Sequence, residues 1–202
     1  MKLYFVRHGE SVVNTKAIIS NHDLVHPLTD KGWQQALALA QQLKRATITR
    51  IFSSPILRAE QTAEILAQGL GVRYEITDAL REFDCGVAEG ESYFDHVNDF
   101  ERLFQDWRSG KSASCFEGGE SLLDVRARVV PFVEQVTRMA SSSDNIVLVS
   151  HGGTLSGALP FVLKNIDSAF AFSHLLNNTG VVVAESTPDG LMCRAWADQT
   201  FG

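Results

Sequence analysis

Two segments of the sequence place a histidine directly before glycine, Arg7-His8-Gly9 near the start and Ser150-His151-Gly152 much later. A neutral imidazole nitrogen is a competent nucleophile, and its attack on phosphorus would divide the hydrolysis of a phosphate ester into two easier displacements. We expect His8 to be this nucleophile. His151, carrying a proton, would donate to the equatorial oxygens of the phosphoryl group, where negative charge must be stabilised in the transition state.

Two arginines offer the positive charge that a bound phosphate needs. The planar guanidinium groups of Arg7 and Arg58 match the oxygens of a phosphate dianion. Backbone N–H groups after Gly9, and those of a helix that begins at Gly152, would add further donors, because helix N-termini favour anions and glycine allows close approach. The sequence therefore predicts a pocket for a phosphate monoester.

The departing alkoxide of such an ester needs a proton, and Glu82 is the acidic residue best placed to give it. The same carboxylate would then take a proton from the incoming water. Asp84 and Glu89 are competing candidates for this role. For three further polar residues, a place in the pocket lining and simple exposure to solvent stay equally open as interpretations. They are His22, His26 and Glu120.

The elements that must position these residues alternate between strands and helices. Residues 3–6 and 146–149 are continuous apolar runs, as expected of strands buried on both faces of a parallel sheet. Shorter strands are expected at 48–53 and 72–77. Ligands of such sheets bind beyond the carboxyl ends of the strands. The residues that follow these four strands are therefore expected to share one crevice: His8, Arg58, Glu82 and His151.

Helical periodicity fills the chain between the strands. A helix over about 30–45, with Thr29 or Asp30 as its cap, is expected to turn its apolar side chains to the core, Trp33 and Leu37 among them. A second helix is expected to begin with Ser54 as N-cap and Pro55 in the first turn, and to end near Gly69.

The second half of the chain predicts one long helix, a cap and a closing hairpin. Ser121 begins a helix whose apolar face extends to Met139, and Pro131 should kink it. The aromatic and charged stretch at about 93–118 carries apolar side chains at helical spacing, which predicts a small helical insertion. Residues 181–196 are typical of a β-hairpin.

These elements predict an α/β fold, a three-layer sandwich in which a mostly parallel central sheet has helices on both faces. With 202 residues, 45% of them hydrophobic, the chain is long enough to bury one substantial core. We therefore expect a single domain over residues 1–202, with the small helical cap inserted at about 93–118.

Composition limits the partners and the compartment. Acidic residues outnumber basic ones by 24 to 18 and no Lys/Arg run is present, so a nucleic-acid or anionic-membrane surface is not expected. The apolar run at 3–6 is too short for a signal peptide or a membrane span. Cys85, Cys115 and Cys193 are odd in number and widely spaced, which favours reduced thiols in the cytoplasm. They form no metal-ligand spacing with the histidines, so neither a metal nor a cofactor is expected.

Five motifs in order resemble the histidine phosphatase superfamily, in its phosphoglycerate mutase-like branch, over nearly the whole chain. They are VRHGES at 6–11, SSPILRAEQTA at 53–63, LREFDCG at 80–86, GGES at 118–121 and VSHGG at 149–153. The resemblance implies that His8 becomes phosphorylated with help from His151, and that Glu82 is the general acid. It also implies that no metal is needed. The phosphate-binding residues that it implies are Arg7, Asn14 and Arg58.

Two departures from the family pattern bear on the activity. Residues 86–90 read Gly-Val-Ala-Glu-Gly where the family often has Gly-x-Trp-Glu-Gly, and Ser20-Asn21 stands where mutases carry Thr-Gly. The second departure, together with the absence of the longer insertion typical of mutases, favours a phosphatase acting on a small phosphorylated metabolite. In length and layout the chain is similar to small members such as α-ribazole phosphatase.

Two other function classes stay open at this point. One is a phosphotransferase of the phosphoglycerate mutase type, which would return the phosphoryl group to an isomer of the substrate. The other is a non-catalytic adaptor that binds a phospholigand on the same fold. Retention of all five expected catalytic residues argues against the adaptor. The leaving-group contacts are expected from loops 15–27 and 84–118, whose residues do not specify the substrate, and the sequence leaves the oligomeric state open.

Overall fold

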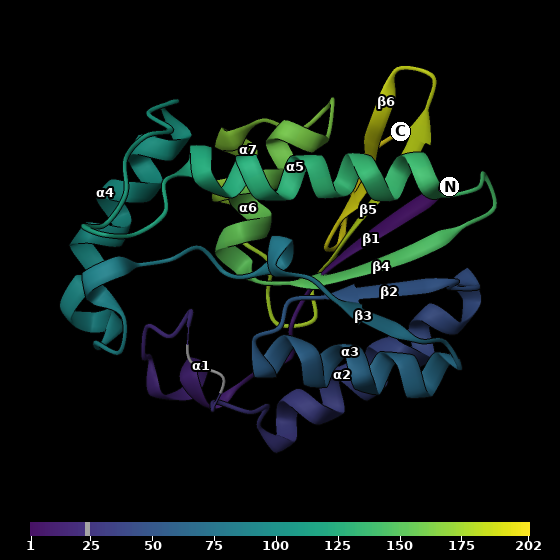
Figure 1. The fold of residues 1–202 in the computed structure, drawn as a ribbon, viewed down its shortest axis with the longest axis horizontal. Coiled ribbons are helices and arrows are strands. Elements are labelled where there is room, and N and C mark those ends of the chain that lie inside the picture. Colours follow the sequence, from purple (N-terminus) through teal and green to yellow (C-terminus); the bar gives the residue numbers. More distant parts are fainter. Residues whose placement is uncertain (23–24) are drawn as a thin grey trace.

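The protein is built on one mixed sheet, seen almost edge-on in Figure 1. The computed structural model describes residues 1–22 and 25–202, so residues 23–24 of the loop expected to contact the leaving group lie outside it. Within the described residues, seven strands lie in the order β3-β2-β4-β1-β5-β6-β7. Four neighbouring strands are parallel: β1 (Lys2–Arg7), β2 (Arg50–Ser53), β3 (Tyr74–Ile76) and β4 (Asn145–Ser150).

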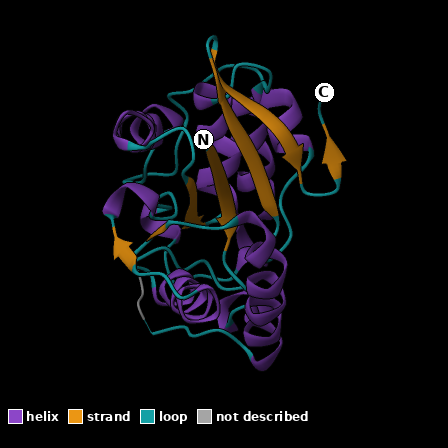
Figure 2. Cartoon of the chain, turned by 90° about the vertical axis from the view of Figure 1, so that its right-hand side faces the viewer, coloured by secondary structure: helices purple, strands orange, loops and turns teal. Residues whose placement is uncertain are grey.

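The remaining strands extend the sheet in the antiparallel direction. They are β5 (Val181–Thr187), β6 (Gly190–Trp196) and β7 (Gln199–Thr200). Figure 2 shows the long hairpin of β5 and β6 beside the shorter strands. The predicted hairpin at 181–196 is confirmed, whereas β7 was missed because two residues carry no recognisable alternation.

Helices cover both faces of the sheet, which confirms the predicted three-layer α/β arrangement (Figure 1). One face carries α2 (Asp30–Leu43) and α3 (Leu57–Leu70), and the other carries α5 (Leu122–Met139), α6 (Gly152–Val162) and α7 (Ser168–Ser173). At the carboxyl ends of the parallel strands lie α1 (Val12–Lys16) and α4 (Val97–Arg108). Single 3₁₀ turns occupy Lys44–Ala46, Asp78–Leu80, Gly86–Ala88 and Tyr93–His96.

Side-chain alternation along the central strands divides the core between these two helical layers. In β1, Leu3 and Phe5 pack toward α5 and α6, whereas Val6 packs toward α2 and α3. In β4, Leu148 packs toward α5 and α6, whereas Val149 packs toward α2 and α3. All five side chains are fully buried, so the prediction of strands covered on both faces is confirmed.

Two features of the predicted helix at 30–45 differ in their outcome. The cap is correct, since Thr29 Oγ1 accepts a hydrogen bond from the N–H of Gly32. The predicted burial of Trp33 and Leu37 is wrong, because these side chains are 41% and 44% exposed. The buried stripe passes instead through Gly32, where a Cβ would lie 2.0 Å from the carbonyl oxygen of Glu10, so this side of α2 packs against the backbone after β1.

The predicted start of the next helix is also wrong, by two residues. The helix α3 begins at Leu57 with Ile56 as its N-cap, and not at Ser54-Pro55. Ser54 Oγ accepts a hydrogen bond from the N–H of Ile56 at 3.2 Å, but it closes a turn that precedes the helix. The helix ends one residue past the predicted Gly69, and Gly71 terminates it in the left-handed conformation.

The long helix and the inserted helix lie near their predicted positions. Ser121 caps α5 in a capping box with Asp124, and α5 runs through Pro131 without interruption. Its last residue, Met139, is 65% exposed and not part of the buried face. Within the predicted insertion, α4 buries three side chains of its apolar stripe, those of Phe100, Leu103 and Trp107. The short α1 and α7 were not predicted, because one turn is too short for periodicity to detect.

Candidate active site

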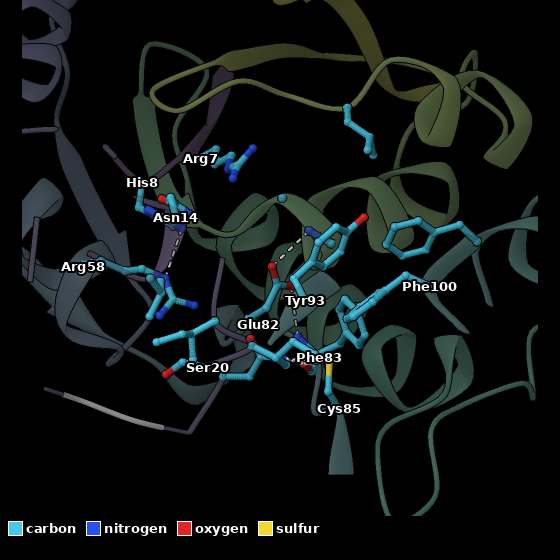
Figure 3. A pocket seen from close by; sticks show the side chains of 18 residues that line it. Arg7, His8, Asn14, Ser20, Arg58, Glu82, Phe83, Cys85, Tyr93 and Phe100 are labelled. Carbon is cyan, nitrogen blue, oxygen red and sulfur yellow. Dashed lines mark hydrogen bonds between the residues drawn. The ribbon is translucent and has the colours of Figure 1, made fainter. Parts of the chain in front are cut away.

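The carboxyl ends of the parallel strands open into a pocket of about 270 Å³. Arg7 is the last residue of β1 and His8 follows it, while His151 connects β4 to α6. Arg58 lies in the first turn of α3, after β2, and Glu82 follows β3 through a 3₁₀ turn. Figure 3 shows Arg7, His8, Arg58 and Glu82 around this pocket. The topology thus brings together residues that lie far apart in the sequence.

His8 is only 3% exposed, and both of its ring nitrogens have partners. Its Nδ1 lies 2.7 Å from the carbonyl oxygen of Gly9, which fixes Nδ1 as the protonated nitrogen. Its Nε2 accepts a hydrogen bond from Nε of Arg58 at 3.1 Å. Burial, and then the charges of Arg58 and Arg7, hold the pKa of His8 well below its usual value. The imidazole is therefore neutral at neutral pH, with its lone pair on the pocket-side nitrogen.

His151 lies directly against His8, with ring centroids 5.1 Å apart. It is fully buried, and its Nε2 lies 2.8 Å from Ser54 Oγ. Burial, and then the charge of Arg58, hold the pKa of His151 well below its usual value. Burial and the neighbouring arginines thus oppose a proton on His151, and its role as a charged donor to a bound phosphoryl group stays a prediction. A bound phosphate dianion would supply the missing negative charge.

Arg7 is held in place by a main-chain contact on one side. Its Nη1 donates to the carbonyl oxygen of Leu176 at 2.6 Å, while its buried Nε has no hydrogen-bond partner in the described part of the chain. A Cβ at Gly152 would lie 3.4 Å from Arg7 Nε, so glycine lets α6 begin close to this side of the guanidinium. Arg7 therefore retains a donor for a ligand in the pocket.

Glu82 occupies the N-terminus of α6. Its Oε1 accepts from the N–H of Thr154 at 2.6 Å, and its Oε2 accepts from the N–H of Gly153 at 3.0 Å. A side chain at Gly153 would collide with Phe83, whose ring would lie 2.3 Å from a Cβ there. The helix end does hold an anion as expected, but two of its N–H groups bind this carboxylate and not a phosphate.

The N–H groups after Gly9, where the sequence predicts phosphate donors, are also occupied. Those of Glu10 and Ser11 donate to Gln35 Oε1 and Asn14 Oδ1, so this prediction is wrong. The N–H of Gly9 itself donates to Thr62 Oγ1 at 3.1 Å, and that hydroxyl in turn donates to the carbonyl oxygen of Arg58. Thr62 thereby ties the loop after β1 to the first turns of α3, which fixes His8 relative to Arg58.

The competing carboxylates lie outside the pocket lining. Asp84 pairs with His22 at 2.8 Å, and Glu89 accepts from the N–H groups of Asn21 and His22. Neither carboxylate lines the pocket, whereas Glu82 does. Their hydrogen bonds tie the loop before residue 23 to the loop after Glu82.

Of the three polar residues left open by the sequence, none belongs to the pocket lining. His22 pairs with Asp84, and His26 lies in the described part of the same loop. Glu120 accepts from Nε and Nη2 of Arg128 at 2.8 and 2.9 Å. This pair supports the segment that carries Glu82, because Arg128 also donates to the carbonyl oxygens of Ala79 and Arg81.

Asn14 lines the pocket beside His8. Its Oδ1 accepts from the N–H of Ser11 and from Nδ2 of Asn178, which leaves the amide N–H₂ to face the pocket. Asn178 also donates to the carbonyl oxygen of His8 at 3.1 Å. Asn178 was not predicted as a site residue, because this asparagine does not follow any predicted strand or helix. Ser54 was recognised only as a helix cap, although it contacts His151.

The described residues contain no group of three or more His, Cys, Asp or Glu side chains placed to hold a metal ion. All three cysteines are free thiols, and Cys85 and Cys193 are buried. Within residues 1–22 and 25–202, no helix is both long enough and apolar enough to cross a membrane. The pocket lining itself carries one imidazole, two guanidiniums and one carboxyl group, and the fully buried ring of His151 lies beside His8.

A buried neutral histidine, two arginines and a carboxyl group at the carboxyl end of an α/β sheet define a phosphoryl-transfer site. The chain matches the histidine phosphatase superfamily (branch 1) over residues 3–199, and it belongs to this family. The family suggested by the five sequence motifs is thereby confirmed.

Two relatives carry names that describe two different activities. A provisionally named phosphoserine phosphatase 2 of Hydrogenobacter thermophilus is 31% identical over 180 residues, covering 89% of this chain and 87% of the relative. A protein of Escherichia coli designated probable phosphoglycerate mutase GpmB is 33% identical over 206 residues, covering 100% of this chain and 93% of the relative.

Two solved structures share the fold over almost the full length of the chain. The mycobacterial glucosyl-3-phosphoglycerate phosphatase has a TM-score of 0.82 at 25% identity, covering 98% of this chain and 99% of the other. The α-ribazole phosphatase of Shigella flexneri has a TM-score of 0.79 at 22% identity, covering 100% and 98%. The likeness to small phosphatases in length and layout is therefore confirmed at the level of the fold.

Proposed function

We propose that this protein hydrolyses a small-molecule phosphate monoester by way of a phosphohistidine at His8. The observation that carries the proposal is the state of the His8 ring. Its Nδ1–H is held by the carbonyl oxygen of Gly9, and its Nε2 lone pair faces Arg58 in the pocket. A neutral, oriented imidazole beside two guanidinium groups has the protonation state and the surroundings required for attack on a bound phosphate.

In the first step, Nε2 of His8 attacks phosphorus, a P–N bond forms and the P–O bond to the leaving group breaks. Arg58 must then transfer its Nε–H donation from His8 to a phosphate oxygen. Arg7 contributes Nε, and Asn14 contributes its amide group, to the same dianion. The negative charge brought by the phosphate favours protonation of His151, which then donates to an equatorial oxygen.

Glu82 supplies the proton that the leaving alkoxide requires. To do so it must carry that proton before the P–O bond breaks, which weakens its hydrogen bonds from α6. In the second step the ionised Glu82 takes a proton from water, the water oxygen attacks phosphorus, and the P–N bond breaks. Phosphate leaves, and His8 returns to its neutral state with all protons accounted for.

The remaining expectations from the sequence extend this proposal. Residues 93–118 act as the cap of a single domain, since α4 places Phe100 and Phe104 at the pocket wall. The three free cysteines favour a reducing compartment, which is the cytoplasm. Arg7, Arg58 and a protonated His151 replace the positive charge that a metal ion would bring.

A mutase is the second candidate, because one relative is designated a phosphoglycerate mutase. A mutase would return the phosphoryl group from His8 to an isomer of the substrate before water reaches it. A non-catalytic adaptor would need neither a free His8 lone pair nor a carboxyl group beside it. The mutase and the adaptor each predict a result that differs from that of a phosphatase in the same assay.

The test is a phosphate-release assay with a panel of phosphorylated metabolites and 3-phosphoglycerate, in excess chelator, with His8→Ala as the matched control. We expect stoichiometric release of phosphate, full activity in chelator, and none above background for His8→Ala. Conversion of 3-phosphoglycerate to its isomer without phosphate release would identify a mutase. Activity that requires an added divalent metal would contradict the proposed chemistry.

A further inference from the structure

The pocket has two chemically different ends (Figure 3). Arg7, His8, Asn14 and Arg58 gather at one end, and Glu82 stands between them and the other end. The wall at the end away from the arginines is aromatic, with Phe83 from the loop after Glu82 and Tyr93 and Phe100 from the cap. The other apolar side chains of the lining come from α1, the loop after it, and α4: Val13, Ile18, Ile19 and Phe104.

The aromatic part of this wall is fixed by packing. Phe83 lies edge-on to the buried Trp107, with ring centroids 5.2 Å apart, and also contacts Phe100 at 6.5 Å. Tyr93 packs on the same Phe100 at 5.1 Å. Phe83 and Phe100 are 4% and 6% exposed, so packing holds these rings in place before any ligand binds.

The same wall offers no positive charge. Arg7 and Arg58 are the cationic side chains among the described lining residues, and both stand at the phosphate end. Neither residue outside the description, Asp23 or Leu24, has a cationic side chain. Glu82 faces the junction of the two ends and brings no positive charge, so a second anion on the substrate would lack a partner there.

One buried polar group lines the pocket between Arg58 and the loop after Glu82 (Figure 3). Ser20 lines the pocket and is 4% exposed, and its Oγ has no hydrogen-bond partner in the described residues. The neighbouring Asn21 is already committed, since its Nδ2 donates to the carbonyl oxygen of Phe83 and to Cys85 Sγ. A buried hydroxyl without a partner is costly, and a polar atom of a ligand would satisfy it.

The apolar surface continues to the mouth of the pocket. Leu175 and Tyr93 line it while remaining 50% and 39% exposed. Phe94, 74% exposed, lies beside Tyr93 with ring centroids 6.3 Å apart. A substrate body that is longer than the cavity therefore stays in contact with apolar side chains as it emerges.

We infer that the leaving group is an uncharged alcohol with an apolar, ring-bearing body and one polar atom in reach of Ser20. This inference rests on the proposed phosphatase activity and specifies its substrate class. It separates the chain from enzymes whose substrates carry a carboxylate next to the phosphate, since that carboxylate would have to lie between Glu82 and the aromatic wall.

The first test compares two esters of the same shape, 2-phenylethyl phosphate and its 4-carboxy derivative, together with phosphoserine and 3-phosphoglycerate. We expect kcat/KM to be about 10²-fold higher for the uncharged ester than for each carboxylate, the cost of burying one unpaired charged group. Equal or higher kcat/KM for the carboxylates would overturn the inference. The activated ester p-nitrophenyl phosphate reports on the chemistry separately, and its failure to react would overturn the proposed function instead.

The second test introduces the missing cation. Leu175→Lys places an amine at the pocket mouth, and the matched control Leu123→Lys alters a leucine of similar exposure, 48%, that does not line the pocket. We expect Leu175→Lys to reduce the preference against the carboxylate esters by about two- to fivefold, as one new ion pair at a partly exposed site allows. The control should leave the preference unchanged. An unchanged preference in Leu175→Lys, or the same shift in both variants, would contradict the inference.

Discussion

Nε of Arg58 donates its hydrogen bond to Nε2 of His8 across 3.1 Å, at the atom that must attack phosphorus. The donor holds the ring in one tautomer, because the accepting nitrogen cannot carry a proton. It also keeps the positive charge next to the place where a phosphate would bind. One contact thus sets both the protonation state of the nucleophile and its orientation before substrate arrives.

Replacement of Arg58 should therefore cost more than its charge alone. Arg58→Lys keeps a cation but loses the Nε–H that faces His8 and the planar fork for phosphate. We expect kcat/KM to fall by about 10²-fold, the usual cost of one oriented donor at a site of charge development. The control is Arg102→Lys on the exposed face of α4. Activity of Arg58→Lys within twofold of the unaltered protein would contradict this role.

The two buried histidines make stability depend on pH. Their pKa values are lowered in the folded protein, chiefly by burial, while the unfolded chain takes up protons near pH 6.5. Below pH 6.5 the unfolded state therefore binds more protons, and the free energy of unfolding falls; above pH 6.5 the effect vanishes. We expect each histidine to contribute a loss of about 1 kcal/mol between pH 6.5 and 5.5.

Urea unfolding of the unaltered protein and of His8→Asn at these two pH values measures the contribution of His8. The variant should lose about 1 kcal/mol less between pH 6.5 and 5.5, because one of the two buried groups is gone. Identical losses in both proteins would mean that His8 is protonated normally in the folded state.

The Glu120–Arg128 pair should act on catalysis through the segment that carries Glu82. Arg128 binds Glu120 and two carbonyl oxygens of residues 79–81, and its side chain is only 20% exposed. We expect Arg128→Met to lower the free energy of unfolding by about 2 kcal/mol, as for loss of hydrogen bonds to a charged group. It should also reduce kcat/KM for an alkyl phosphate more than for p-nitrophenyl phosphate.

The leaving-group dependence distinguishes this positioning role from general destabilisation. Arg102→Ala removes an exposed ion pair with Asp99, and it should change stability by about 1 kcal/mol or less and leave both esters unaffected. If Arg128→Met lowers activity on both esters equally, Arg128 supports the fold without a particular effect on Glu82.

Glu82→Gln tests the general acid itself. The amide cannot donate a proton to an alkoxide, so kcat/KM for an alkyl phosphate should fall by about 10²-fold or more, and far less for p-nitrophenyl phosphate. Both esters should be compared below neutral pH, with the thermal stability of each protein measured alongside. Equal losses on both esters would assign Glu82 a structural role at the start of α6.

The sequence predicted the fold and the meeting of the site residues for one physical reason. Residues 3–6 and 146–149 are apolar without alternation, so they had to be central parallel strands, and the topology of such sheets brings their carboxyl ends together. The positions of His8 and His151 followed directly. Helix boundaries were predicted less well where one residue pair fits both a turn and a helix start. Ser54-Pro55 is such a pair, and it closes a turn before α3.

Contacts between side chains and distant backbone could not be predicted in the same way. Glu82 accepts hydrogen bonds from N–H groups at the start of α6, and Thr62 accepts one from the N–H of Gly9. Both contacts result from the way loops pack in three dimensions. The neutral state of His151 likewise depends on its burial beside His8 and Arg58. Such features follow from the tertiary environment, and no local residue pattern encodes them.

The account depends most directly on a covalent bond between phosphorus and Nε2 of His8. Brief mixing with substrate followed by an alkaline quench should trap this bond, because a phosphoramidate survives base and breaks down in acid. Peptide mapping should then place one phosphoryl group on the peptide that contains His8, and His8→Ala should trap none. Phosphate found on a serine, cysteine or aspartate, or turnover without any trapped phosphoenzyme, would contradict the account.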